Sequence, residues 1–185
     1  MKVLVIALAL LAGCASVAKL EGERTVGERM TITLDGAWNQ VNAPGVGPAD
    51  LWTLEGVPVD RLLIYAGVKD GQPVHTQTGG TQKHITFSSR MQPEQIVAMF
   101  EGMFTRDGSR FRLTRLEPSS FAGNGFRFEY ALTRSADDLQ LAGVGYAAVS
   151  NGELFALLYQ APRIEFFPRH RARVEAMART VKLKD

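Results

Sequence analysis

Three histidines are the side chains best able to serve as metal ligands or general bases at neutral pH in this sequence. His75 and His84 flank a polar segment and converge if that segment folds back, whereas His170 falls on the apolar stripe of a segment with helical spacing. Zinc ligands usually come two to a turn or loop, and no two of these histidines are that close in sequence. We therefore predict no metal and no cofactor, a hydrogen-bonded His170 at the edge of the core, and a candidate ligand site at His75 and His84.

Other catalytic motifs are incomplete. The serine pairs at 88–89 and 119–120 lie outside a Gly-x-Ser-x-Gly elbow. Residues 143–148 read Gly-x-Gly-x-x-Ala, but they lie within a predicted strand, whereas a dinucleotide site needs this motif at a strand-to-helix turn. The carboxylates at 137–138 fit a solvated turn. The sequence therefore predicts no catalytic residue and favours a binding role over an enzymatic one.

The single cysteine, Cys14, follows a short apolar segment. Lys2 and nine consecutive apolar residues at 3–11 precede it. This run is too short to span a bilayer, which needs about 20 residues, and is typical of a secretory signal peptide. Leu11-Ala12-Gly13-Cys14 resembles the bacterial lipobox. The alternative is that Cys14 is an unmodified thiol.

The lipobox resemblance implies where in the cell the protein is located. It implies cleavage of the signal peptide at 1–13, acylation of Cys14 by a diacylglyceryl group and an amide-linked chain such as palmitate, and anchoring in a membrane. Because Ala15 rather than Asp follows the cysteine, the resemblance implies the outer membrane, facing the periplasm, with retention in the inner membrane as the less favoured alternative.

Composition excludes several other classes of protein. With 45% hydrophobic residues and a net charge of +2, the chain is neither disordered nor basic enough to indicate nucleic-acid binding. One cysteine cannot form a disulfide framework. Four arginines gather at 163, 169, 171 and 173, where a solvated helix face is favoured over contact with anionic lipid or with a partner.

Periodicity predicts one domain at 30–185, preceded by a flexible, lipidated tether at 14–29. The polar composition of residues 69–84 predicts a long loop that is either functional or flexible. The predicted elements are strands at 30–34 and 60–68, a helix at 93–106, strands at 110–117, 126–133, 139–149 and 153–161, and a helix at 168–181.

The last predicted hairpin indicates the layers of the fold. Residues 154–159 are apolar on both faces, so both faces must be covered. Gly143, Gly145 and Ala147 share one face of the neighbouring strand and favour close packing of a helix there. Arg112 and Glu129 are expected to pair across their strands. We therefore expect an α+β fold, a three-layer α/β/α sandwich with an antiparallel sheet and a helix on each face.

The whole chain resembles a group of uncharacterised proteobacterial lipoproteins, through the segments at 87–91, 125–129, 143–146 and 161–163. The order of its elements also resembles the PsbP/DcrB type of sandwich. That resemblance implies a non-catalytic accessory or binding protein with a partner in the envelope. The alternative is a small-ligand carrier or enzyme with a pocket beside residues 69–84.

Overall fold

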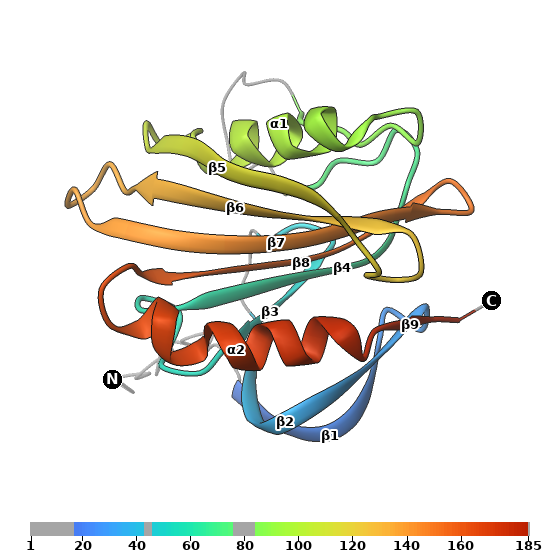
Figure 1. Cartoon of the computed structure of the whole chain (residues 1–185), viewed down its shortest axis with the longest axis horizontal. Coiled ribbons are helices and arrows are strands. Elements are labelled where there is room, and N and C mark those ends of the chain that lie inside the picture. Colours follow the sequence, from blue (N-terminus) through green and yellow to red (C-terminus); the bar gives the residue numbers. More distant parts are fainter. Residues whose placement is uncertain (1–16, 43–45, 76–83, 185) are drawn as a thin grey trace, which may run out of the picture.

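A computed structural model describes residues 17–42, 46–75 and 84–184 (Figure 1). The predicted signal peptide and Cys14 lie outside these described residues. The elements are, in chain order, β1 Val17–Val26, β2 Met30–Val41, β3 Ala49–Thr53, β4 Arg61–Lys69, α1 Pro93–Phe104, β5 Arg110–Ser119, β6 Gly125–Thr133, β7 Gln140–Ser150, β8 Glu153–Pro162, α2 Phe166–Arg179 and β9 Lys182–Leu183.

The strands form one sheet in which every pairing is antiparallel. Their order is β1-β2-β3-β4-β8-β7-β6-β5, and β9 pairs with β2. β8 follows β7 through the tight turn at Asn151 and Gly152, as the sequence predicts, and then pairs with β4 on its other side. The predicted α+β class with an antiparallel sheet is confirmed.

The predicted tether is wrong over most of its length, because residues 17–26 form strand β1. β1 pairs with β2 from Val26 opposite Met30 to Val17 opposite Val41. A tight turn joins the two strands, and Gly27 adopts the positive φ of 56° that this turn requires. The sequence of β1 looks like a tether because its side chains are almost all exposed, so no apolar face marks it as a strand.

Alternate residues of β8 enter two separate hydrophobic clusters. Phe155, Leu157 and Tyr159 pack in one cluster with residues of α2, and Leu154, Ala156 and Leu158 pack in another with residues of α1. Since successive side chains of a strand point to opposite faces, both faces of β8 are buried. Figure 1 shows the two helices far apart, with α1 beside β5 and α2 near β2, and α2 also contacts β7 and β8.

The glycines of β7 accommodate aromatic rings rather than a helix, which corrects the expectation for this face. A Cβ atom at Gly143 would lie 2.1 Å from the ring of Tyr130, and one at Gly145 would lie 2.2 Å from the ring of Phe128. Tyr130 and Phe128 are the cross-strand partners of these glycines on β6. The rings therefore fill the space that β-carbons would occupy.

Candidate functional site

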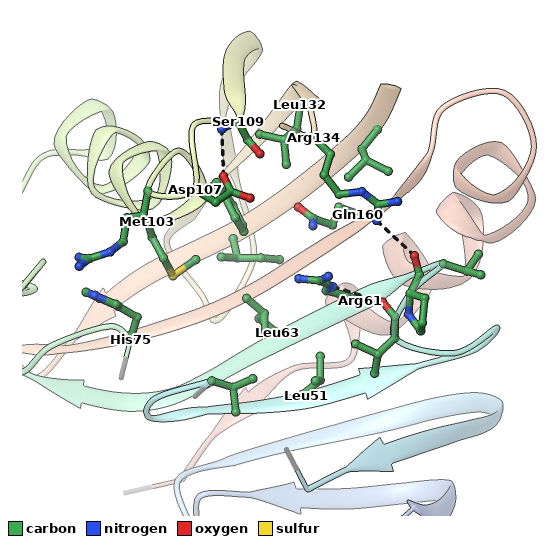
Figure 2. A pocket seen from close by; sticks show the side chains of 18 of the residues that line it. Leu51, Arg61, Leu63, His75, Met103, Asp107, Ser109, Leu132, Arg134 and Gln160 are labelled. Carbon is green, nitrogen blue, oxygen red and sulfur yellow. Dashed lines mark hydrogen bonds between the residues drawn. The ribbon is translucent and has the colours of Figure 1, made fainter. Parts of the chain in front are cut away.

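A cavity of about 530 Å³ lies over the sheet next to the C-terminal end of α1 (Figure 2). Its volume is within the range of small-molecule sites, roughly 300–1,000 Å³. Its apolar floor consists of leucines from five neighbouring strands, namely Leu51, Leu63, Leu132, Leu141 and Leu158. α1 covers the adjoining part of the same face and ends at Phe104, and the leucines beyond its end line the cavity.

Charged side chains surround this floor, and we call the site the arginine-rimmed cavity. Arg61, Arg106 and Arg134 line it together with a single carboxylate, Asp107. Burial raises the pKa of Asp107, but hydrogen bonds from Ser109 outweigh this effect and lower the pKa overall, so the carboxylate is ionised at neutral pH. With Asp137, which binds Arg134, two aspartates balance part of the charge of the three arginines, and the rim stays positively charged.

Arg61 has the most available guanidinium in the rim. Its Nε donates to the carbonyl oxygen of Val57 over 3.2 Å, and in the described part of the chain no carboxylate lies within ion-pair distance of it. The side chain is exposed at the cavity mouth, yet desolvation and the neighbouring Arg134 lower its pKa. An anion here would relieve the repulsion between the two arginines, and arginine binds carboxylates and phosphates through two parallel hydrogen bonds.

Arg134 is held in place by Asp137. Its Nε and Nη2 donate to the two carboxylate oxygens over 2.8 and 2.6 Å, and Nη1 donates to the carbonyl oxygen of Pro58 over 3.4 Å. The hydrogen bond from Arg134 lowers the pKa of Asp137 to about 2. The turn at 137–138 therefore has a structural role in orienting a cavity arginine.

Gln160 is a polar side chain in the otherwise apolar strand β8. It is 8% exposed and lines the cavity. Its Oε1 accepts a hydrogen bond from the Tyr130 hydroxyl over 3.3 Å. Burial raises the pKa of Tyr130, so this hydroxyl keeps its proton and acts as the donor.

His75 lies at the other side of the cavity, near Met103 (Figure 2). It is 9% exposed, and neither ring nitrogen has a hydrogen-bond partner among the described residues. The preceding residue, Val74, is fixed because its carbonyl oxygen accepts a hydrogen bond from the buried Tyr65 hydroxyl. Desolvation, followed by Arg106 and His84, lowers the pKa of His75, so the ring is neutral at neutral pH.

The candidate pair of histidines is only partly brought together. The ring centroids of His75 and His84 are 6.5 Å apart, but His84 is exposed and does not line the cavity. Backbone hydrogen bonds join the ends of the predicted loop, since Val74 N donates to Ile85 O and Phe87 N donates to Gln72 O. Residues 76–83 of that loop lie outside the described residues. The described residues include no cluster of three potential metal ligands.

A buried carboxylate shapes the wall of the cavity. Asp60 is fully buried and accepts hydrogen bonds from the hydroxyl of Thr53 and the backbone N–H groups of Leu54 and Glu55. These bonds close the loop between β3 and β4, and residues 57–59 of this loop line the cavity.

The remaining charged groups make structural contacts outside the cavity. His170 is hydrogen-bonded to Glu55 at 2.8 Å, as predicted for a histidine at the edge of the core. The expected pairing of Arg112 with Glu129 is wrong, because Arg112 lies opposite Ala131, whereas Glu129 lies opposite Arg115, beyond a bulge after Leu113.

The arginines of the predicted basic cluster on α2 also have partners. Arg169 pairs with Glu165 over 2.6 Å, Arg171 pairs with Glu175 over 2.8 Å, and Arg173 donates to the carbonyl oxygen of Ala37 over 2.7 Å. In the part of the chain that the structure covers, no helix has the length and apolarity needed to cross a bilayer.

Comparison of the sequence with protein families and with curated proteins gives no match. Among solved structures, the chain is similar to cyanobacterial PsbP (CyanoP) from Synechocystis sp. PCC 6803, with a TM-score of 0.60 and 11% sequence identity. The likeness covers 94% of this chain and 95% of that one. The chain therefore has a PsbP-type fold, as the order of elements predicts. At this identity the likeness shows the fold alone.

Proposed function

We propose that this protein is a lipid-anchored component of the bacterial envelope that binds a small amphiphilic anion in the arginine-rimmed cavity. The proposed location follows from the lipobox at Cys14, which implies attachment to the outer membrane on the periplasmic side. The proposal includes the three-layer sandwich, which the two clusters on opposite faces of β8 support. An additional protein partner in the envelope remains a prediction from the sequence.

The single observation that carries the binding role is the combination of an apolar floor with unsatisfied polar groups. Leucines from five strands would contact a hydrocarbon body, while Arg61 and the Nε2 of Gln160 would bind an acidic head group. Buried polar groups are normally hydrogen-bonded, so the two ring nitrogens of His75, which have no partner among the described residues, favour a ligand as their partner. A wholly polar anion would make no use of the leucine floor, and a neutral lipid would leave Arg61 without a counter-charge.

Binding rather than catalysis fits the geometry best. The Oγ of Ser109 accepts a hydrogen bond from the backbone N–H of Ser135, and His75 bonds to no serine among the described residues. A nucleophile adjacent to a base, which covalent catalysis requires, is therefore not seen in the described cavity.

Calorimetric titration of decanoate tests the proposal directly. Both hydrophobic clusters lie within 17–184, so a soluble chain comprising 15–185 keeps every described core contact. We expect wild-type protein to bind decanoate with one site per chain. Arg61→Ala should weaken binding by about 10- to 100-fold, because a hydrogen bond to a charged group contributes about 1.5–3 kcal/mol.

Arg112→Ala is the matched control. Arg112 is exposed on β5 and does not line the cavity, so its loss should leave the affinity within about twofold of wild type. Absence of decanoate binding by the wild-type chain, or equal losses in both variants, would contradict the proposed function.

A further inference from the structure

A row of directly paired residues connects the cavity floor to the beginning of the described chain. Leu158 of β8 lies opposite Leu63 of β4, and Leu63 lies opposite Leu51 of β3. The row continues to Val41 of β2 and then to Val17 of β1. Directly opposed residues of an antiparallel sheet lie on the same face, so the two valines share the face of the cavity leucines.

The valines extend this apolar row beyond the cavity. Val17 is 62% exposed, and Val41 is half-buried. A second hollow of about 320 Å³ shares Val46 and Leu51 with the cavity and reaches Val41; its polar lining residues are Gln40, Asn42 and Asp50. With neighbouring strands about 4.8 Å apart, Val17 lies roughly 10 Å from the cavity wall at Leu51.

The position of Val17 in the chain indicates what lies next to it. Cys14 is three residues earlier, and a residue of extended chain spans at most about 3.6 Å, so an acylated Cys14 would hold Val17 within about 11 Å of its lipid attachment point. Because β1 replaces the expected tether, the folded domain begins almost directly at the anchor. The exposed end of the valine row is therefore the part of the cavity face nearest to the lipid surface.

We infer that the arginine-rimmed cavity takes its ligand from the membrane that holds Cys14, across Val17 and Val41, and that the ligand is a single-chain lipid anion such as a fatty acid. This inference rests on the proposed function, from which it takes the acidic head group and the apolar body. It adds the source of the ligand and its path. The acyl chain passes over the valines onto the leucine floor, and the acidic head group is bound at Arg61.

Two measurements separate the path from the binding site. In the first, the full acylated chain is reconstituted in vesicles of phosphatidylethanolamine and phosphatidylglycerol. The vesicles are then loaded with the fluorescent fatty acid cis-parinarate, and energy transfer from Trp38 and Trp52 reports its arrival in the domain. Arg61→Ala gives the background. In the second, the soluble chain is titrated with decanoate as described above.

Val17→Glu places a charge at the exposed end of the row without altering the cavity. We expect it to slow arrival from the vesicle by about tenfold, because a charged group opposes contact with the hydrocarbon surface, and to leave decanoate affinity in solution within about twofold of wild type. Thr25→Glu, which adds the same charge near the other end of β1, should change neither measurement.

The outcomes distinguish the inference from the proposed function. If Val17→Glu and wild type acquire parinarate at the same rate while decanoate still binds, the ligand comes from solution and the membrane path is wrong. If the soluble wild-type chain does not bind decanoate, the proposed function fails and the inference fails with it. Slower arrival for Val17→Glu alone, with unchanged decanoate affinity, supports both.

Discussion

The Tyr130 hydroxyl donates a hydrogen bond to Oε1 of Gln160 over 3.3 Å and thereby connects the aromatic core to the cavity. Tyr130 is buried within the α1-side cluster, and its ring lies 5.5 Å from that of Phe104 and 4.9 Å from that of Phe111. This packing fixes the hydroxyl, and the hydroxyl in turn fixes the orientation of the Gln160 amide. Orientation of the polar group in the cavity thus depends on core packing.

Replacing Tyr130 with Phe tests this dependence. The variant loses a buried hydrogen bond and leaves Oε1 of Gln160 without its donor, so the free energy of unfolding should fall by about 1–3 kcal/mol. The amide can then rotate, and decanoate affinity should fall by about 3- to 10-fold. Urea denaturation and calorimetric titration measure the two effects.

Tyr146→Phe provides the control for a lost tyrosine hydroxyl. The Tyr146 hydroxyl accepts a hydrogen bond from Nε of Arg127 over 3.2 Å, in the cluster on the α2 side. Its removal should reduce stability to a similar extent without changing decanoate affinity. A Tyr130→Phe variant that binds decanoate as tightly as wild type would show that the hydroxyl does not orient Gln160.

Gly145→Ala should destabilise the protein although alanine is small. Its Cβ would lie 2.2 Å from the Phe128 ring, which is fully buried and stacks on the Phe100 ring at 6.4 Å. Overpacking of this kind costs about 1–3 kcal/mol. The measurement is the free energy of unfolding in urea.

Gly102→Ala, in contrast to Gly145→Ala, should stabilise the protein. Gly102 lies within α1, and a Cβ there would be 3.4 Å from Cδ1 of Ile85, which is a tolerable contact. Because alanine is the better helix former, we expect a gain of up to about 1 kcal/mol. Equal changes in the free energy of unfolding for Gly145→Ala and Gly102→Ala would contradict the role assigned to the β7 glycines.

His75 predicts a specific dependence of stability on pH. Burial lowers its pKa in the folded state, so as the pH falls through about 6.5 the unfolded chain takes up a proton before the folded chain does. The unfolded state then binds more protons, and stability decreases with falling pH below about 6.5 and is constant above it on account of this residue. An anion in the cavity would favour the charged ring and reduce this loss.

Comparison with His75→Gln isolates the contribution of this histidine. Between pH 7.5 and 5.5, wild-type protein should lose more unfolding free energy than His75→Gln. Identical pH profiles for wild type and His75→Gln would show that the ring is not protected from protonation in the fold.

Much of the fold could be predicted because its elements bury regular apolar patterns. α1 and α2 have apolar stripes, and β6 alternates residue by residue between buried and half-buried side chains. β1 could not be predicted, since nearly every side chain is exposed and its pairing with β2 depends on backbone hydrogen bonds. The register of β5 could not be predicted either, because the hydrophobic pattern of the sequence does not indicate the bulge after Leu113.

The cavity was only partly predictable for a related reason. His75 was identified from its place beside a polar segment, but the arginines of the rim come from three separate parts of the chain and meet only through the strand order. One feature of the sequence does indicate a cavity residue. Gln160 is the single amide in the apolar run at 154–161, and an isolated polar residue in a strand buried on both faces indicates a specific partner.

The most direct test of the central claim is to locate a bound ligand by NMR. Intermolecular NOEs between decanoate and the methyl groups of the soluble chain report which side chains contact the hydrocarbon. We predict NOEs from the decanoate methylenes to Leu63 and Leu158 on the cavity floor, and their loss in Arg61→Ala. NOEs to Val174 or other residues of the α2-side cluster, with none to the cavity leucines, would contradict the account.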